Sequence, residues 1–385
     1  MEVSTPPSFD PASAKTRLSA AFAELANETE HGGAAIALWQ GDHSLLSLQC
    51  GESSPGVGWT ESTPCLIWSA SKGVAAATTL HALQKNRIEL ETPVVKLWPE
   101  FAASGKERIT LTQLLSHRAG LAAIEIKGLS ITDHESVVQA LAAQTPNWEF
   151  DNTHALHGYG ARTFGFLLDE VVRRLTSTTL SDYWNQVFRE PLNLDLWFGL
   201  PEKKLTEAAT VIAPRTPPAP SDFSRAFGDP TSLTRRALSE PNSRLGTLTP
   251  SVMNSPEIRM ASIPSLGVIA TADALARFYA LLAAPNPFFT ESTRALMKTS
   301  LSHGLDLTLL AETSFSTGFM TNYFGVYGPS KSAFGHPGAG GSLGFADPEN
   351  ALGFAFIPSA MHPGALPGPR TQKLVQALYG LLDSE

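Results

Sequence analysis

The stretch Trp68-Ser69-Ala70-Ser71-Lys72 precedes a run rich in alanine and leucine that extends to Leu83. Alanine and leucine have high helix propensity, so a helix is predicted to begin near Ser69. Residues three apart lie on one face of a helix, which places the Lys72 amine beside the Ser69 hydroxyl. A serine becomes a nucleophile when a base lies next to it, and a desolvated lysine with a lowered pKa can be that base. Ser69 is the only serine in the chain with a lysine three residues downstream, although this spacing is also compatible with the start of a surface helix.

Two short motifs lie further along the chain: Tyr159-Gly160-Ala161 and, in a glycine-rich stretch, His336-Pro337-Gly338. Together with the Ser69 motif they resemble the S-x-x-K, Y-x-N and K-T-G motifs of the penicillin-binding serine hydrolases. The flanking residues are similar to the esterase-type branch of the class C β-lactamase-like proteins, the family VIII carboxylesterases. The similar segments extend from about residue 30 to the C-terminus and include Ile67-Trp68-Ser69-Ala70-Ser71-Lys72-Gly73, Leu114-Leu115-Ser116-His117-Arg118-Ala119-Gly120-Leu121, His157-Gly158-Tyr159 and Gly335-His336-Pro337-Gly338-Ala339-Gly340-Gly341-Ser342.

The resemblance implies a role for each motif. Ser69 would be the nucleophile that forms an acyl-enzyme, with Lys72 and Tyr159 as the acid/base groups. Which of these two is the primary base stays open. The oxyanion would be bound by the backbone N–H groups of Ser69 and Ala339. Gly338 fits this arrangement, because substrate would have to lie against its strand without a side chain in the way.

Two positions depart from the β-lactamase pattern. Ala161 occupies the place of the amide side chain in Y-x-N, which helps to bind lactam amide groups. His336 replaces the lysine of K-T-G, which helps to hold the substrate carboxylate, and a histidine is mostly neutral at pH 7 unless its surroundings raise its pKa. Both changes weaken the recognition of a charged lactam. They therefore favour a carboxylesterase that acts on small, uncharged acyl esters.

Other functions remain compatible with the same motifs. A β-lactamase or a D-aminopeptidase would use the same nucleophile on an amide bond. An acyltransferase would pass the acyl group to an acceptor other than water. A catalytically inactive homologue that binds peptides or cell-wall fragments would keep the fold alone.

Two other residues could suggest a catalytic role. Gly340-Gly341-Ser342-Leu343-Gly344 satisfies G-x-S-x-G, but a nucleophile elbow needs a helix after the serine, and the residues that follow predict a strand end and a turn. Ser342 is therefore expected to be a structural residue of a sheet. His117 is expected to pack near the interface between two lobes rather than to take part in catalysis.

The composition bounds the partners and the compartment. A net charge of −8, from 28 basic and 36 acidic residues, argues against nucleic acid or an anionic membrane as a partner. No apolar run approaches the roughly 20 residues that span a bilayer. The first seven residues lack a basic start followed by an apolar stretch, so no secretory signal is expected and a cytoplasmic location is predicted. The two cysteines, Cys50 and Cys65, are expected to be buried free thiols.

No metal-ligand cluster and no nucleotide-binding glycine loop stand out, so neither a metal nor a cofactor is expected. The expected partner is a small-molecule ester or amide, and the oligomeric state is left open.

A hydrophobic content of 43% over 385 residues supports a substantial core. The resemblance implies an α/β (α+β) fold of the β-lactamase/transpeptidase type, in which an antiparallel sheet built from both termini is flanked by helices and an all-α lobe is inserted. The expected lobes are an α/β lobe, residues 1–67 plus 264–385, and a predominantly helical lobe, residues 68–263. Within the second, a long loop is expected at 203–262, where the family places a variable wall of the acyl pocket.

Hydrophobic periodicity and turn residues predict the individual elements. A capping box at Thr110 should open a short helix that Gly120 ends, and Thr271 should cap a later helix. The predicted strands are 34–39, 45–48, 332–335, 341–346 and 352–357, and the other predicted helices are 12–26, 135–143, 161–175 and 370–382.

Overall fold

The computed structural model describes residues 9–28, 32–149, 156–364 and 366–381. Residues 1–8 and 382–385 lie outside the described residues. The expectation about the N-terminus concerns the first of these segments, and the last residue of the predicted C-terminal helix belongs to the second.

A nine-stranded sheet forms the centre of the sheet-containing half, and its strand order is β3-β2-β1-β12-β11-β10-β9-β8-β7. Its recorded strand pairs are antiparallel, and β1 pairs with β12, so the first and last long strands of the chain are neighbours. This confirms the predicted sheet built from both termini. The strands are β1 (Gly33–Gln40), β2 (His43–Ser54), β3 (Val57–Gly58), β7 (Ser302–Leu305), β8 (Glu312–Phe315), β9 (Met320–Thr321), β10 (Phe334–Pro337), β11 (Leu343–Asp347) and β12 (Leu352–Pro358).

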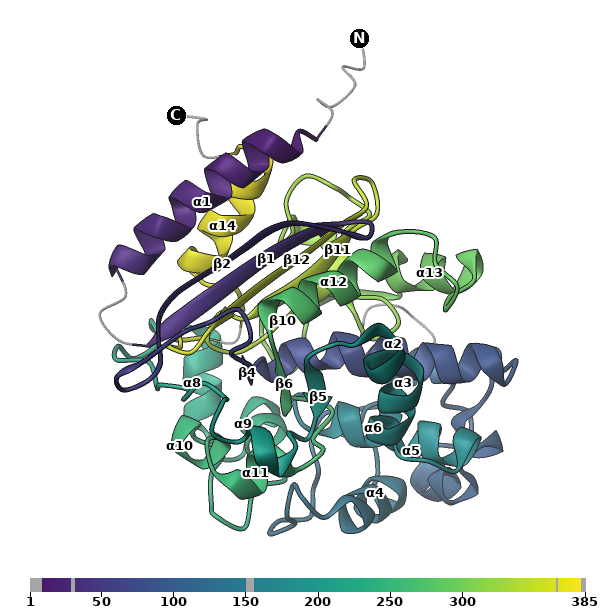
Figure 1. Cartoon of the computed structure of the whole chain (residues 1–385). Helices are drawn as coiled ribbons and strands as arrows, with labels where there is room; N and C mark the ends of the chain where they lie inside the picture. Colours follow the sequence, from purple (N-terminus) through teal and green to yellow (C-terminus); the bar gives the residue numbers. More distant parts are fainter. Residues whose placement is uncertain (1–8, 29–31, 150–155, 365, 382–385) are drawn as a thin grey trace.

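Helices cover both faces of this sheet. Figure 1 shows α1 (Pro11–Glu28) and α14 (Pro369–Tyr379) on one side and α12 (Ala272–Ala283) on the other. The alternation of side chains along β12 explains this arrangement, because Phe354 and Phe356 join the core cluster of α1 and α14. Ala355 and Ile357 join the cluster that contains α12.

The other half of the molecule is mostly helical and contains a small sheet in the order β4-β6-β5. Its centre is α2 (Ser71–Lys85), which is buried from Ser71 to Leu83. The remaining elements are β4 (Cys65–Leu66), β5 (Leu196–Phe198), β6 (Val268–Ala270), α3 (Leu111–Leu115), α4 (His134–Ala143), α5 (Thr163–Thr176), α6 (Leu180–Trp184), α7 (Glu190–Leu192), α8 (Asp222–Gly228), α9 (Leu233–Ser239), α10 (Pro250–Met253), α11 (Pro256–Met260) and, beside the sheet, α13 (Glu291–Lys298).

Local signals in the sequence predict the longest helices of the molecule, whereas strands β3 to β9 and helices α6, α7 and α13 are not predicted. The Thr110 side chain accepts the Gln113 N–H and completes the predicted capping box of α3, and Thr271 caps α12 through the Ala274 N–H. Two expectations are wrong. Helix α3 ends at Leu115 rather than near Gly120, because His117 takes the left-handed conformation that ends it. The segment 203–262 is not a bare loop, because it holds the short helices α8 to α11.

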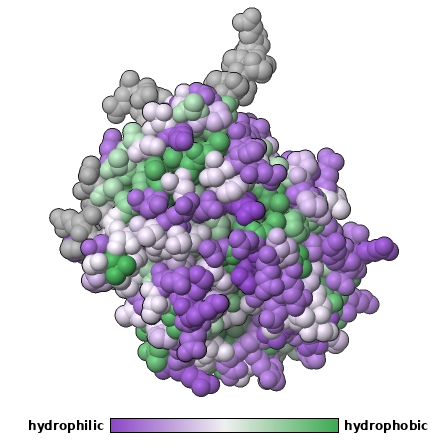
Figure 2. Space-filling model, in the orientation of Figure 1, coloured by the Kyte–Doolittle hydropathy of each residue, from purple (hydrophilic) through white to green (hydrophobic). Residues whose placement is uncertain are grey.

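The division into two lobes at residues 67/68 and 263/264 stays a prediction. No helix formed by the described residues is long and apolar enough to cross a membrane. Figure 2 shows hydrophilic residues over much of the face in view, with smaller hydrophobic patches between them.

Close packing of α12 on the sheet predicts the effect of one substitution. A Cβ atom at Gly353 would lie 2.0 Å from the Ala276 carbonyl oxygen and 2.1 Å from the Ala280 nitrogen, both in the backbone of α12. Backbone atoms of a packed helix cannot move aside cheaply, so Gly353→Ala should lower the free energy of unfolding by about 2 kcal/mol or more. Urea denaturation measures this change. Gly58→Ala is the matched control, because a Cβ there meets nothing within 4 Å, and an equal loss in both variants would contradict the prediction.

Candidate active site

Ser69 lies in the 3₁₀ turn Trp68–Ala70, directly before α2, so the predicted helix starts two residues after the serine. Trp68 has a φ of 50°, which is a strained value for a residue with a side chain. The next serine stabilises the turn: the Ser71 hydroxyl donates to the Trp68 carbonyl oxygen at 2.5 Å and accepts the Val268 N–H at 3.0 Å. The turn is thereby attached to β6, and Ser69 itself remains half-buried.

Lys72 is fully buried, with 0% of its surface exposed. Its Nζ atom is 2.8 Å from the Ala161 carbonyl oxygen, 2.9 Å from the Ser265 carbonyl oxygen and 3.4 Å from Ser69 Oγ. Among the described residues no carboxylate forms an ion pair with it. Burial therefore lowers the pKa of Lys72 well below its ordinary value of 10.5. A neutral amine has two N–H donors for the two carbonyl groups and keeps a lone pair toward Ser69.

Tyr159 is brought to the same point from a distant part of the chain. Its hydroxyl lies near enough to the Ser69 side chain for that side chain to influence its pKa, and the Lys72 Nζ atom lies 4.6 Å from the centroid of its ring. Burial raises the pKa of Tyr159 above its ordinary value of 10, and the Ser69 side chain only partly opposes this. The phenol is therefore protonated at neutral pH.

His336 lies on β10, and its ring centroid is 5.8 Å from that of Tyr159. Its Nδ1 atom lies 2.7 Å from the Pro337 carbonyl oxygen and must carry a proton to donate to it. The Nε2 atom is then an acceptor, and no described residue bonds to it. Burial, followed by the nearby Lys72 amine, lowers the pKa of His336 to about 3. The position that is lysine in K-T-G is thus an uncharged imidazole at pH 7.

Gly338 is required for a close approach within the protein itself, and its expected role beside the substrate stays a prediction. A Cβ atom there would lie 2.3 Å from the Ile67 carbonyl oxygen and 2.1 Å from Ser342 Oγ, so the glycine lets β10 pack directly against the Ser69 turn. The following N–H, that of Ala339, donates to no residue in the described part of the chain. This N–H follows Gly338, which packs against the Ser69 turn, and it is available as a donor.

The competing serine has the structural position that the sequence predicts. Ser342 is 1% exposed, and its hydroxyl donates to the Ile67 carbonyl oxygen at 2.7 Å. It is followed by the strand β11 and not by a helix. G-x-S-x-G is therefore not a nucleophile elbow here.

The structure adds three residues that sequence reasoning did not place in the site. Ser265 supplies a carbonyl to Lys72, and no motif marks it. Asp306 accepts the Tyr159 N–H on both carboxylate oxygens, at 3.2 and 3.1 Å. His117, which was expected only to pack, lies with its ring centroid 5.1 Å from that of Tyr159. The one signal in the sequence that could have placed His117 in the site is that it belongs to a segment, Leu114-Leu115-Ser116-His117, that is similar to the family.

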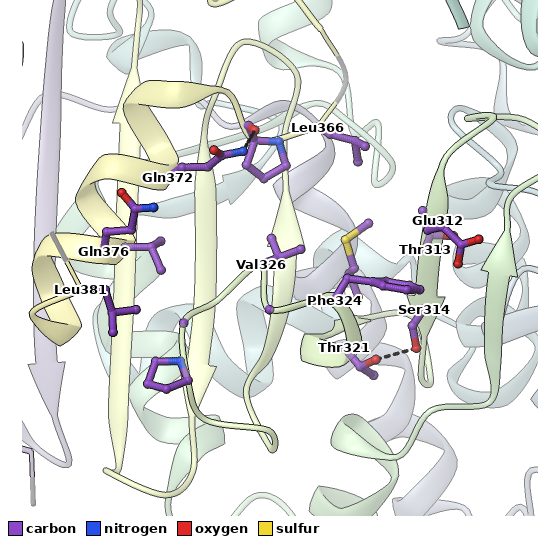
Figure 3. A pocket seen from close by; sticks show the side chains of 16 residues that line it. Glu312, Thr313, Ser314, Thr321, Phe324, Val326, Leu366, Gln372, Gln376 and Leu381 are labelled. Carbon is purple, nitrogen blue, oxygen red and sulfur yellow. Dashed lines mark hydrogen bonds between the residues drawn. The ribbon is translucent and has the colours of Figure 1, made fainter. Parts of the chain in front are cut away.

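Other features lie outside this cluster. Both cysteines are free thiols, and burial raises the pKa of Cys65 to about 12; Cys50 is only half-buried, contrary to expectation. A groove of about 510 Å³ opens between α14 and the β8–β9 region (Figure 3), where Gln372 and Gln376 face Ser314 and Thr321 across Val326 and Phe324. No three potential metal ligands are grouped among the residues that the structure describes.

Comparison with known proteins identifies relatives of this chain. The model of the Beta-lactamase family matches residues 18–378. The Esterase/beta-lactamase LipL of Mycobacterium tuberculosis is 29% identical over 355 residues, which cover 88% of this chain and 79% of that protein. A novel penicillin-binding protein homologue from Caulobacter crescentus superimposes with a TM-score of 0.86 and 28% identity, over 96% of this chain and 98% of that chain. A family VIII carboxylesterase superimposes with a TM-score of 0.84, also with 28% identity and the same coverage.

The family match spans most of the chain, and the sheet with its inserted helices is the fold of these relatives. The chain therefore belongs to the Beta-lactamase family and is a serine hydrolase with a β-lactamase/transpeptidase-like fold.

Proposed function

We propose that the protein is a carboxylesterase that cleaves small, uncharged acyl esters through an acyl-enzyme on Ser69. One observation carries this proposal: a half-buried serine hydroxyl lies 3.4 Å from the buried Lys72 amine, which has no carboxylate partner among the described residues, and close to the Tyr159 hydroxyl. A nucleophile, a base and an acid are thereby within reach of one another.

Lys72 is the better candidate for the base. Its pKa is lowered and that of Tyr159 is raised, so at neutral pH the amine can accept a proton and the phenol can donate one. In acylation the Ser69 proton passes to Lys72 as Oγ attacks the ester carbonyl carbon. The oxyanion that forms is stabilised by the N–H groups of Ser69 and Ala339.

Tyr159 completes the first half of the reaction. Its hydroxyl donates a proton to the oxygen of the leaving alcohol as the carbon–oxygen bond breaks, and the Lys72 ammonium returns a proton to the phenolate. Water then repeats the attack on the acyl-enzyme with the same groups, and the acid and Ser69 are released. Each step conserves protons and needs no cofactor.

The surroundings of Ser69 favour esters over charged lactams. His336 is neutral, and Ala161 contributes a carbonyl to Lys72 but has no side-chain amide to offer. A β-lactam carboxylate would thus meet no cation at the position of the K-T-G lysine. β-Lactam hydrolysis is the second candidate, because the relative from Mycobacterium tuberculosis is named as both esterase and β-lactamase.

The role of Ser69 is tested by labelling as well as by turnover. Ser69→Ala should abolish hydrolysis of p-nitrophenyl butyrate and stoichiometric labelling by a fluorophosphonate, because the nucleophilic oxygen is absent. Mass spectrometry of the intact protein and of its peptides measures the label. Ser342→Ala is the matched control and should still be labelled on the Ser69 peptide. A wild-type label on any other residue, or turnover by Ser69→Ala, would overturn the assignment.

The substrate class is tested by comparing kcat/KM values for substrates with different scissile bonds. The kcat/KM values for p-nitrophenyl esters of two to twelve acyl carbons should exceed that for a chromogenic cephalosporin by at least about 100-fold, the factor expected when a charge partner of its carboxylate worth about 3 kcal/mol is missing. They should also exceed that for D-alanine p-nitroanilide. A cephalosporin that is hydrolysed as fast as the best ester would show the second candidate to be correct.

The neutral state of Lys72 predicts how stability depends on pH. In the unfolded chain this amine binds a proton below about pH 10.5, whereas the buried amine stays neutral to a lower pH. The wild type should therefore lose stability as the pH falls from about 10.5 toward 8, by up to about 1.4 kcal/mol per pH unit from this group. Lys72→Met lacks the group, so its free energy of unfolding should rise relative to that of the wild type over this range.

Urea denaturation at several pH values measures this difference, and parallel curves would show that Lys72 keeps its proton in the folded protein. The same variant should lose at least about 100-fold in kcat, as expected when a general base is removed. Lys85→Met, on an exposed position of the same helix, is the control for activity.

A further inference from the structure

We propose that His117 and Asp306 are positioning residues that hold the backbone on both sides of Tyr159 and so set the place of its hydroxyl at Ser69. The inference rests on the proposed role of Tyr159. It concerns residues that do not contact the reacting atoms themselves.

The backbone N–H groups of three consecutive residues carry the argument. The Gly158 N–H donates to the His117 carbonyl oxygen at 3.1 Å, and the Gly160 N–H donates to His117 Nδ1 at 3.2 Å. Between them, the Tyr159 N–H donates to the carboxylate of Asp306. One residue thus holds the amides before and after the tyrosine, and a second residue holds the amide of the tyrosine itself.

Asp306 is in turn held rigidly. It is 0% exposed, and its Oδ1 atom accepts the N–H groups of Thr308 at 2.7 Å and Leu309 at 2.8 Å. Its Oδ2 atom accepts the Thr313 hydroxyl at 3.4 Å and lies 3.8 Å from His157 Nε2. The carboxylate therefore links the Tyr159 loop to a fixed turn and to strand β8.

The backbone of His117 indicates that its side chain is needed at this place. Its φ is 59°, in the left-handed region, and the Arg118 N–H donates to the Gln113 carbonyl oxygen at 2.8 Å. This is the pattern of a Schellman motif at the end of α3, in which glycine is the usual residue. A histidine there costs about 1 kcal/mol of backbone strain. Such strain is retained where the side chain contributes something that glycine cannot.

The ring of His117 also packs around the tyrosine. It lies 4.6 Å from the ring of Phe315, which is stacked on Tyr159 at 5.9 Å and an interplanar angle of 10°. His117, Phe315 and the Lys72 amine thus surround the phenol ring, while the hydrogen bonds fix its backbone. A displacement of about 1 Å in a group that transfers protons can cost 100-fold in rate, so this support bears directly on catalysis.

Two substitutions at His117 separate its acceptor from its ring. Both His117→Gly and His117→Asn remove the ring, but asparagine places Oδ1 where Nδ1 was and also tolerates positive φ. His117→Asn should retain kcat for p-nitrophenyl butyrate within about fivefold of the wild type. His117→Gly should lose about 10- to 100-fold in kcat with little change in KM, although glycine suits the backbone better. Equal or higher activity of His117→Gly would overturn the proposal.

A double-mutant cycle shows whether His117 acts through Tyr159. If it does, His117→Gly should lower the activity of Tyr159→Phe by less than about twofold, because the hydroxyl that it positions is already absent. Independent, multiplicative losses would show that His117 acts elsewhere. Ser177→Gly is the control, since it places glycine at the left-handed cap of α5, an exposed position.

Hydrogen exchange distinguishes a failure of this inference from a failure of the proposed function. The Gly160 amide should exchange at least about tenfold faster in His117→Gly than in the wild type and in His117→Asn, whether or not any ester is hydrolysed. Unchanged exchange overturns the positioning role. If the Gly160 amide exchanges faster in His117→Gly but the wild type neither hydrolyses esters nor is labelled at Ser69, the positioning role is kept and the proposed carboxylesterase function is overturned.

Discussion

A buried amine without a counter-charge is the constraint on which the site depends. The Lys72 amine donates to two backbone carbonyl oxygens, and no carboxylate among the described residues pairs with it. Burial therefore favours its neutral form. An ammonium ion at this place would cost several kcal/mol that no carboxylate among the described residues offsets. The folding of α2 into the core thus creates the proposed base, because the same burial that shields the helix from water lowers the proton affinity of its lysine.

The residues around this amine come from separate parts of the chain and meet through backbone contacts. Ala161 and Ser265 hold the amine with their carbonyl groups, and Gly338 lets β10 reach the Ser69 turn. None of these contributions depends on a polar side chain. This explains why a neutral His336 can occupy the place of a lysine without disturbing the arrangement: the charge at that position is not what assembles the site.

Local patterns in the sequence predict the central strands and the longest helices of the frame, and they are weakest where tertiary contacts determine the backbone. Short apolar runs bounded by turn residues identify β1, β11 and β12, and threonine caps identify α3 and α12. The predicted end of α3 is wrong, because His117 takes the left-handed conformation and ends the helix before Gly120 is reached. The short helices in 203–262 were missed, because proline and serine obscure the periodicity over four to seven residues.

The motif residues and their order can be read along the chain, because the spacing from Ser69 to Lys72 is local and a helical start converts it into a contact. The protonation states of Lys72, Tyr159 and His336 cannot be read in this way, since they follow from burial, which depends on the folded chain. The contributions of Ser265 and Asp306 also depend on the folded chain. Ser265 is 193 positions from Lys72 and Asp306 is 147 positions from Tyr159, so only folding brings each pair into contact.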